Sequence, residues 1–291
     1  MLPPFELLTP RSLAEAVEML AARPEALPLS GGTSLLVDCR GGRVAPSCLL
    51  DLSRVEELRG IERSDDALTI GAATTIAEIS SDPSIAEHAG ILREAATAFA
   101  NPLVRNRATI GGNLAYASPA ADCAPPLLAL GAEVELGSAR ETRAVPLHAF
   151  FLGVRSTVRE PTELLTAIRV PLSPDGARAG YRKLGLRKAD AISVVSAAVW
   201  AKFTGRTCDA ARIALGAVAP VPLRATSAEA ALTDDEMTDE AIREAARLAA
   251  ATVRPIDDVR ASAAYRRRVV EVLVRRLLRS LAASREGERC R

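Results

Sequence analysis

Two segments that each combine a pair of adjacent glycines with neighbouring hydroxyl groups are the features of this 291-residue sequence that most directly suggest chemistry. Glycines let backbone N–H groups approach an anion, hydroxyl groups add further donors, and a helix that starts nearby adds the dipole of its N-terminus. The first segment is therefore a candidate phosphate site, although a tight turn alone explains an isolated glycine pair equally well. Its residues are Leu29, Ser30, Gly31, Gly32, Thr33, Ser34 and Leu35.

The second glycine pair lies 80 residues further along, in a polar stretch expected to be neither a helix nor a regular strand. Neither segment has the spacing of a Walker loop or of a G-x-G-x-x-G dinucleotide fingerprint. Two such segments in one α/β domain indicate a ligand with two phosphates, or an extended dinucleotide, held from both sides. The residues of the second segment are Thr109, Ile110, Gly111, Gly112 and Asn113.

Other residue types that support catalysis are sparse. Asp122 precedes an expected helix, where it could bind a ribose or a ring edge, although capping the helix is the simpler interpretation. His88 and His148 are the only histidines, and neither lies in a nucleophile motif. The cysteines form no C-x-x-C pair, so we expect neither a metal site nor a catalytic residue in this chain. They are Cys39, Cys48, Cys123, Cys208 and Cys290.

The composition is that of a soluble globular protein, with 48% hydrophobic residues, 25% charged residues and a formal net charge of +1. It excludes a disordered or collagen-like chain and argues against a nucleic-acid partner. No apolar run approaches the roughly 18 residues that cross a membrane. The first six residues contain two prolines and an acid where a secretory signal would be basic and apolar. We therefore predict a cytoplasmic protein.

Short strands and helices alternate in the first part of the chain, as expected for small β/α units. A helix should follow a cap at Ser12 and end at residue 20, and two more should span residues 85–100 and 122–130. The expected strands are residues 5–8, 27–29, 49–52, 68–71, 133–136 and 164–170.

A stretch rich in proline, serine and glycine at residues 171–176 is the expected domain boundary. We predict a first domain over residues 1–175, with subdomains of about 1–55 and 56–175, and a second over residues 176–291. The second should contain an antiparallel meander followed by helices. Its expected strands are residues 181–186, 192–203 and 208–218, and its expected helices are 240–251 and 265–283.

The last helix carries an apolar stripe and a group of arginines. The stripe should pack on the sheet of its own domain. The arginines should lie on the opposite face, solvated or at a subunit interface rather than on nucleic acid. The stripe consists of Val269, Val272, Leu273, Leu277 and Leu281. The arginines are Arg266, Arg267, Arg268, Arg275, Arg276 and Arg279.

Four motifs in the same order and register resemble the FAD-binding medium subunit of molybdenum hydroxylases, the enzymes of the xanthine dehydrogenase and carbon monoxide dehydrogenase type. They are S-G-G-T-S-L-L from residue 30, R-N-x-A-T-I-G-G-N-L from 105, S-P-A-A-D from 118 and Y-R-K-L-G-L-R-K-A from 181. The resemblance implies an α+β fold: a two-subdomain FAD-binding region of the PCMH (vanillyl-alcohol-oxidase-like) type, then a C-terminal antiparallel sheet with helices, like that of the CO dehydrogenase flavoprotein.

The resemblance also assigns roles to particular residues. Residues 29–35 and 109–113 would wrap the pyrophosphate and ribityl chain of FAD. Asp122 would contact the flavin side, Leu164 would line the adenine pocket through its backbone, and Lys183 would lie near the isoalloxazine. Relatives often have an acid at the position of Ala191, whereas here Asp190 follows Ala189 directly. We therefore assign no flavin role to Asp190.

The function implied by the resemblance is electron transfer. The chain would pass electrons from the [2Fe–2S] clusters of a small partner subunit through FAD to an external acceptor. Substrate oxidation would occur at the molybdopterin cofactor of a large partner subunit, in a dimer of heterotrimers. Two alternatives remain open at this point: a stand-alone flavin oxidoreductase, and a flavin-free interaction protein that retains the fold.

Overall fold

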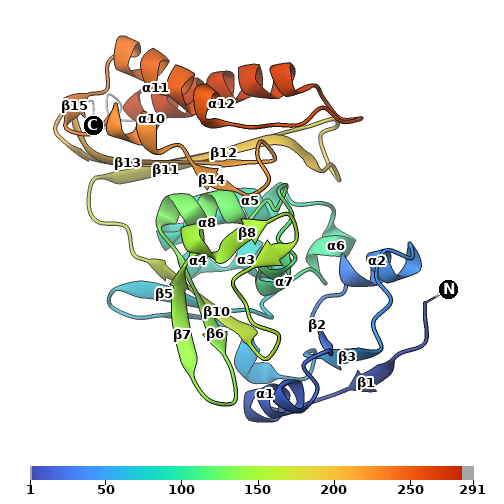
Figure 1. Cartoon of the computed structure of the whole chain (residues 1–291). Helices are drawn as coiled ribbons and strands as arrows, with labels where there is room; N and C mark the ends of the chain where they lie inside the picture. Colours follow the sequence, from blue (N-terminus) through green and yellow to red (C-terminus); the bar gives the residue numbers. More distant parts are fainter. Residues whose placement is uncertain (1, 284–291) are drawn as a thin grey trace.

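The computed structural model describes residues 2–283 of the chain. Met1 and residues 284–291, and with them Cys290 and the outer limits of both predicted domains, lie outside the described residues. Figure 1 shows a small sheet near the N-terminus, a five-stranded sheet in the middle and a third sheet at the other end, with helices between and over them. This mixed α and β arrangement confirms the predicted fold class.

The N-terminal sheet is parallel, with strand order β1-β3-β2. Ser12 caps the first helix as predicted, because its side chain accepts a hydrogen bond from the backbone N–H of Glu15. Ala16 and Leu20 of that helix pack on Leu50 of the central strand. The elements are β1 (Glu6–Leu8), α1 (Leu13–Ala22), β2 (Leu27–Leu29), α2 (Leu35–Arg40) and β3 (Cys48–Asp51).

The middle sheet is antiparallel, with strand order β4-β5-β10-β6-β7, and a hairpin of β8 and β9 lies beside it. Its strands are β4 (Ile61–Arg63), β5 (Ala67–Gly71), β6 (Glu133–Gly137), β7 (Thr142–Pro146), β8 (Phe151–Gly153), β9 (Ser156–Thr157) and β10 (Leu164–Pro171). The helices around it are η1 (Glu56–Leu58), α3 (Ile76–Ser81), α4 (Pro83–His88), α5 (Gly90–Thr97), α6 (Pro102–Arg105), α7 (Ile110–Ala115), α8 (Ala124–Leu130) and α9 (Leu147–Phe150).

Two elements of this region differ from the prediction. The helix expected over residues 85–100 is broken at Ala89, whose backbone leaves the helical region (φ −137°, ψ 42°), so that α4 and α5 are separate. The stretch at residues 109–113, expected to be irregular, forms the start of α7, with Thr109 as its N-cap. Two glycines lower helix propensity, but here the first of them, Gly111, lets the helix pack directly against the backbone of Ala72.

The C-terminal sheet is an antiparallel meander, as predicted. Helices α11 and α12 cover its outer face, and α5 and α8 of the preceding region pack against its inner face (Figure 1). β10 ends at Pro171 and β11 begins at Ala177. The elements are β11 (Ala177–Gly185), β12 (Ser193–Thr204), β13 (Thr207–Gly216), β14 (Leu223–Arg224), α10 (Thr226–Ala230), β15 (Asp235–Glu236), α11 (Asp239–Thr252) and α12 (Ala263–Ala283).

The buried face of α12 is rotated relative to the predicted stripe. Leu277 and Leu281 are buried as predicted, but Val269, Val272 and Leu273 are only partly buried. The other residues of the buried face are Arg266, Val270, Val274 and Leu278. None of the helices within residues 2–283 is sufficiently long and apolar to cross a membrane.

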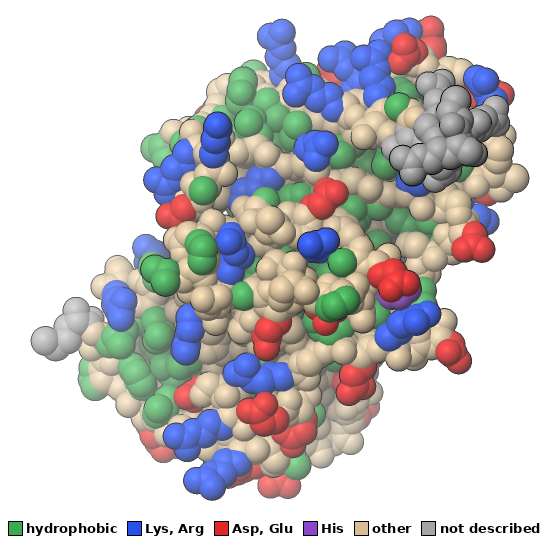
Figure 2. All heavy atoms as spheres, turned by 180° about the vertical axis from the view of Figure 1, so that it is seen from behind, with side chains coloured by type: hydrophobic (Ala, Val, Ile, Leu, Met, Phe, Trp, Pro, Cys, Tyr) green, Lys and Arg blue, Asp and Glu red, His purple; other side chains and the backbone are tan. Residues whose placement is uncertain are grey.

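Arg266 was expected on the outer face of α12 and is instead in the core, because its guanidinium donates to the carbonyl oxygens of Val194 (2.6 Å) and Ala217 (3.1 Å) and pairs with Asp258 (2.7 Å). Figure 2 shows basic side chains gathered over the end of the molecule that α11 and α12 form. On that face Arg279 pairs with Asp239 at 3.0 Å. A role of this face in subunit association stays a prediction.

Candidate functional site: a cavity between two glycine segments

The two glycine segments meet at one cavity of about 260 Å³, which lies between the N-terminal subdomain and the middle sheet. Three of the predicted site residues, Ile110, Asp122 and Lys183, do not line it. The predicted residues that do line it are Leu29, Ser30, Gly31, Gly32, Thr33, Ser34, Leu35, Thr109, Gly111, Gly112, Asn113 and Leu164. The fold therefore brings together residues that are more than a hundred positions apart in the sequence.

Direct backbone contact joins the two segments. A Cβ atom built on Gly31 would lie 1.8 Å from the carbonyl oxygen of Arg107, which immediately precedes the second segment. A Cβ on Gly111 would lie 2.7 Å from the carbonyl oxygen of Ala72. Both distances are far below van der Waals contact, so no residue larger than glycine fits either position without moving backbone.

The first segment has hydrogen-bond donors without acceptors. Within residues 2–283, the backbone N–H groups of Gly31, Gly32, Thr33 and Ser34 donate to no protein atom, and the hydroxyl groups of Ser30, Thr33 and Ser34 have no partner. Gly32 adopts a left-handed conformation (φ +72°) that turns the chain at this point. Consecutive free amides around such a turn form a concavity suited to an anion.

In the second segment, the backbone N–H groups of residues 110–113 all donate to protein atoms. Gly111 N donates to Ala72 O at 2.9 Å, and Ile110 N donates to Thr74 O at 3.0 Å. The N–H groups of Gly112 and Asn113 are bonded to the side chain and the carbonyl of Thr109, at 3.2 and 2.9 Å. This segment can therefore offer a ligand one backbone N–H, that of Thr109, which has no acceptor within residues 2–283. Its other donors are side-chain groups, chiefly the Thr109 hydroxyl and the Asn113 amide, whose oxygen accepts from Cys123 N at 3.3 Å.

Asp122, just before α8, and Lys183, in β11, form an ion pair. The Lys183 ammonium lies 2.6 Å from Asp122 Oδ2, and the hydroxyl of Ser193 donates to Oδ1 at 2.5 Å. Both charged side chains are over nine-tenths buried. Burial raises the pKa of Asp122, and the charge of Lys183 opposes that rise. Lys183 lines a second cavity of about 870 Å³ along the domain boundary.

Ile110 is part of the core, because its side chain is fully buried. No group of three His, Cys, Asp or Glu side chains converges as metal ligands would within residues 2–283. The cysteines in that range, Cys39, Cys48, Cys123 and Cys208, are all buried as free thiols. The roles of Ile110, Asp122 and Lys183 toward a ligand stay predictions.

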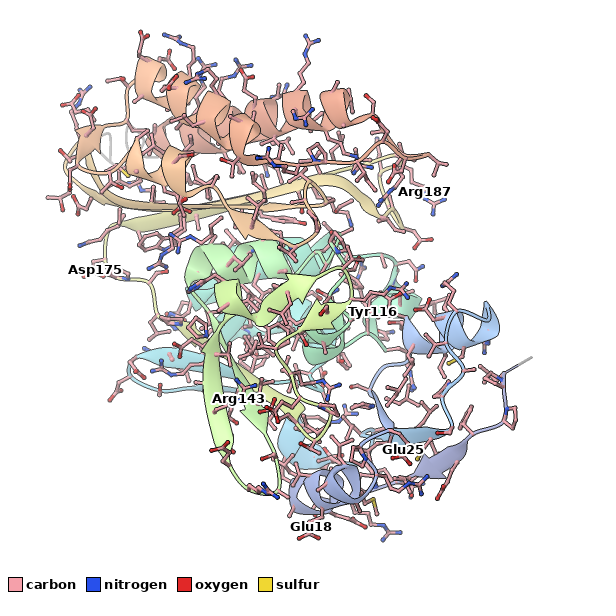
Figure 3. The ribbon with its side chains drawn as sticks, viewed as in Figure 1. Glu18, Glu25, Tyr116, Arg143, Asp175 and Arg187 are labelled. Carbon is pink, nitrogen blue, oxygen red and sulfur yellow. The ribbon has the colours of Figure 1, made fainter. Side chains whose placement is uncertain are left out.

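Tyr116 lines the cavity and was not singled out from the sequence. Figure 3 labels Tyr116 among the side chains. Its hydroxyl donates to Asp38 Oδ2 at 2.9 Å and accepts from Arg155 at 2.5 Å. The Asp38 side chain is 2% exposed and also pairs with Arg43. Because α2 carries Asp38 and Tyr116 directly follows α7, this cluster links the helices behind the two glycine segments. The signal in the sequence was a lone acid within an apolar run at residues 35–39.

Arg159 is the second residue that sequence reasoning missed. Among the described residues that line the cavity, it is the one ionised side chain. Its Nη1 group donates to the carbonyl oxygens of Glu160 (2.9 Å) and Glu163 (2.7 Å). Burial lowers the pKa of Arg159. Apart from Leu164 and Leu165, the residues that line the cavity come from distant segments, so the sequence around Arg159 does not single it out.

Comparison with known proteins identifies relatives along nearly the whole chain. Residues 3–173 match the family described as "FAD binding domain in molybdopterin dehydrogenase", and residues 179–281 match "CO dehydrogenase flavoprotein C-terminal domain". The carbon monoxide dehydrogenase medium chain of Hydrogenophaga pseudoflava is 36% identical over 96% of this chain and 97% of its own length. A putative xanthine dehydrogenase FAD-binding subunit of Escherichia coli K12 is 30% identical over 95% of this chain and 96% of its own length.

Solved structures agree with the sequence comparisons. Carbon monoxide dehydrogenase from Hydrogenophaga pseudoflava, in a form that lacks the Mo-pyranopterin moiety of its molybdenum cofactor, contains a chain that matches with a TM-score of 0.94 at 37% identity. The match covers 97% of this chain and 99% of that chain. A chain of quinoline 2-oxidoreductase from Pseudomonas putida 86 matches with a TM-score of 0.91 at 32% identity, over 98% of this chain and 99% of that chain.

Proposed function

Because the chain belongs to the family of FAD-binding medium subunits of molybdenum hydroxylases, we propose that it is the electron-transfer subunit of such an oxidoreductase complex. Its partners would be a small [2Fe–2S] subunit, which supplies electrons, and a large subunit that holds the molybdopterin cofactor, arranged as a dimer of heterotrimers. An external acceptor would take the electrons from the complex. When bound, FAD supplies the redox chemistry.

The observation that carries the proposal is the set of free donors on the first glycine segment. Unpaired amides and hydroxyls on a cavity wall fit the oxygens of a pyrophosphate, since neutral donors directed at one point bind anions well. The residues that line this wall supply seven such donors: the backbone N–H groups of residues 31–34 and three hydroxyl groups. The residues present therefore fit FAD.

The other predicted residues would contact parts of FAD on either side of the pyrophosphate. The side chains of Thr109 and Asn113 would contact the ligand from the second segment, opposite the pyrophosphate-binding turn. Leu164 would line the adenine pocket. Lys183, held by Asp122, would lie beside the isoalloxazine at the domain boundary. The described cavity wall contains no histidine, cysteine or carboxylate, so the chain's own part is to bind, orient and shield the cofactor.

The test is the flavin content of the purified full-length chain. We expect a flavin absorption spectrum, about one noncovalent FAD per chain after acid extraction, and rebinding of FAD by the flavin-free protein. Thr33→Val removes one free hydroxyl and should weaken FAD binding by about three- to tenfold, as for one lost hydrogen bond. The control is Thr142→Val, on the exposed edge of the middle sheet. A folded chain that binds no FAD in titration would exclude the proposal.

A further inference from the structure

Arg159 stands out because the rest of the cavity wall is uncharged within the described residues. It lies in the connection between β9 and β10, and the same cavity also has an apolar part of the wall. That part consists of Leu27, Leu52, Leu58, Leu164 and Leu165. The cavity thus has a polar wall at the first glycine segment, an apolar wall and one cation.

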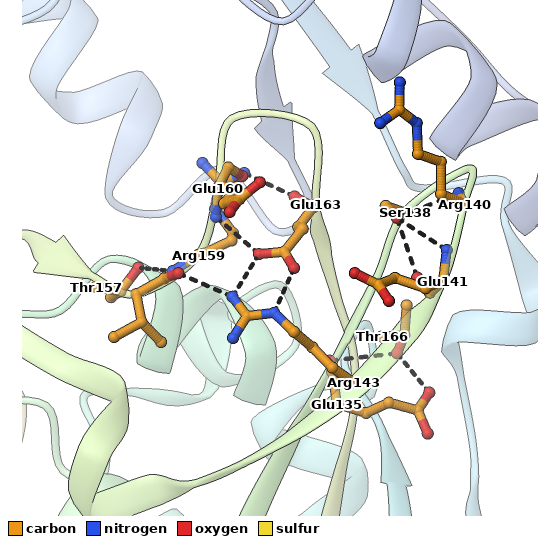
Figure 4. A network of polar contacts seen from close by, with 11 residues as sticks. Glu135, Ser138, Arg140, Glu141, Arg143, Thr157, Arg159, Glu160, Glu163 and Thr166 are labelled. Carbon is orange, nitrogen blue, oxygen red and sulfur yellow. Dashed lines mark hydrogen bonds and ion pairs between the residues drawn. The ribbon is translucent and has the colours of Figure 1, made fainter.

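The charge of Arg159 has no hydrogen-bonded carboxylate. The neighbouring acid, Glu163, is already occupied, because its two oxygens accept from Arg143 at 2.6 and 2.9 Å, and from Glu160 N at 2.8 Å (Figure 4). The Glu163 side chain is only 7% exposed. Arg159 contacts only backbone carbonyls, through Nη1, and its Nε and Nη2 groups have no hydrogen-bond partner within residues 2–283.

These two hydrogen bonds fix the guanidinium of Arg159 but leave its other N–H donors without acceptors. Two carbonyl contacts at one nitrogen hold the group in place, while the other donors and the planar face remain available. The charge of the Glu163 carboxylate acts on Arg159 without a hydrogen bond between these two groups. A partly buried cation that no carboxylate hydrogen-bonds is costly unless something else contacts it. An arginine plane beside apolar side chains is a favourable surface for a flat aromatic ring, and its free donors suit a phosphate or hydroxyl group.

The geometry of the cavity indicates which half of a dinucleotide lies there. A pyrophosphate on the first glycine segment leaves two halves of the ligand to extend in different directions. The redox-active ring has to be reached by electron donors and acceptors, whereas the adenylate half has no such requirement and can be enclosed. At about 260 Å³, the cavity can enclose only part of a dinucleotide.

We propose that Arg159 binds the adenylate half of the cofactor and thereby makes the site select FAD over FMN. FMN shares the flavin ring and one phosphate with FAD but lacks the adenylate. The proposal rests on the proposed function, since it presumes that the cavity holds a flavin dinucleotide. It adds to that function a residue that sets which flavin is bound.

The experiment is a titration of the flavin-free full-length chain with FAD and, separately, with FMN, followed by isothermal calorimetry. Arg159→Met should lower the affinity for FAD about tenfold, the effect of one partly desolvated cation contact, and leave the affinity for FMN unchanged. Arg140→Met is the matched control, because Arg140 is an exposed arginine in the nearby β6–β7 turn and does not line the cavity. It should change neither affinity.

Two further measurements keep the test decisive. Arg159→Gln keeps a donor for the two carbonyls but removes the charge, and it should lose the same preference for FAD. ADP carries the adenylate half without a flavin, so its own dissociation constant, measured by calorimetry on the flavin-free chain, should rise about tenfold in the variants. Equal weakening of FAD and FMN, or unchanged FAD and ADP binding, overturns the proposal. If the wild type binds no FAD, the proposed function itself has failed.

Discussion

The two glycine segments contain the same kinds of residue and use them in opposite ways. In the first segment, four successive amides, from Gly31 to Ser34, have no acceptor within residues 2–283. In the second, the amides from Ile110 to Asn113 are all bonded to protein atoms. Paired glycines with nearby hydroxyls therefore do not by themselves indicate a phosphate site. The destination of the backbone N–H groups distinguishes a binding turn from a packed helix start.

The first glycine of each pair, by contrast, has the same role in both segments. Gly31 lies against the backbone of Arg107, and Gly111 lies against that of Ala72. Each allows a close approach that any Cβ would prevent. A loss of FAD after substitution of either glycine would therefore report displaced backbone. Direct contacts with the cofactor have to be tested through side chains.

The largest expected effect is that of Gly31→Ala, which separates the two segments. The new Cβ would lie 1.8 Å from Arg107 O, a backbone atom that no rotamer change can move away. We expect a loss of about 3 kcal/mol or more in the free energy of unfolding, measured by urea denaturation, together with loss of FAD. Gly90→Ala is the control, since no atom lies within 4 Å of its Cβ. A Gly31→Ala protein as stable as the wild type would contradict the contact.

An intermediate effect should distinguish the hydroxyl groups of the two segments. Thr109 caps α7 by accepting from Gly112 N, so Thr109→Ala should cost about 1 kcal/mol of stability. Thr109→Ser should restore it. Ser34 occupies the corresponding position before α2 but makes no capping bond. Ser34→Ala should therefore leave the unfolding free energy within about 0.5 kcal/mol of wild type and weaken FAD binding three- to tenfold. If both alanine variants lose stability equally, the contrast between the segments is wrong.

The sequence was sufficient for those elements that local patterns determine. The meander of β11 to β13 and the cap at Ser12 follow from alternation and from one favourable residue. Contacts between distant segments decided the rest. α7 forms because Ala72, far away in the chain, accepts from Gly111 N. Arg266 is buried because the ends of other elements supply its acceptors.

In the candidate site, too, some features are visible in the sequence and others depend on contacts between distant segments. The composition of residues 29–35 identified a donor-rich turn, because glycines and hydroxyls are visible in a linear sequence. Whether those donors are free depends on hydrogen bonds across the fold, and so does the burial of Ile110. Arg159 became significant only because the fold places it on the wall of the cavity. Residue type can therefore nominate a binding segment, whereas the state of each donor requires the structure.

The smallest expected effect concerns the link between the helices behind the two segments, through Asp38 and Tyr116. Burial raises the pKa of Asp38, but hydrogen bonds from Arg43 and Tyr116 and the charge of Arg155 outweigh it, so the pKa is lowered below its ordinary value of 3.8. A lowered pKa in the folded state means that the stabilisation is present above that ordinary value and is lost as the pH falls through the folded pKa.

We therefore expect FAD affinity to fall as the pH is lowered from 7 to 3. The part of this loss that Asp38 contributes should appear only below about pH 4. It should be below about 1 kcal/mol, because the arginine partners of Asp38 are half-exposed. Asp38→Asn should weaken FAD binding at pH 7 and flatten this dependence, since a neutral amide cannot lose the charge that holds the two helices together. Asp66→Asn is the matched control: the pKa of Asp66 is also lowered, by Ser64 and Arg169, but these partners do not connect it to the helices behind the two glycine segments. Calorimetric titration of each variant with FAD across the pH series distinguishes the effect of Asp38→Asn from that of Asp66→Asn. An Asp38→Asn curve parallel to that of the wild type would show that the two segments are held together by backbone packing at Gly31 alone.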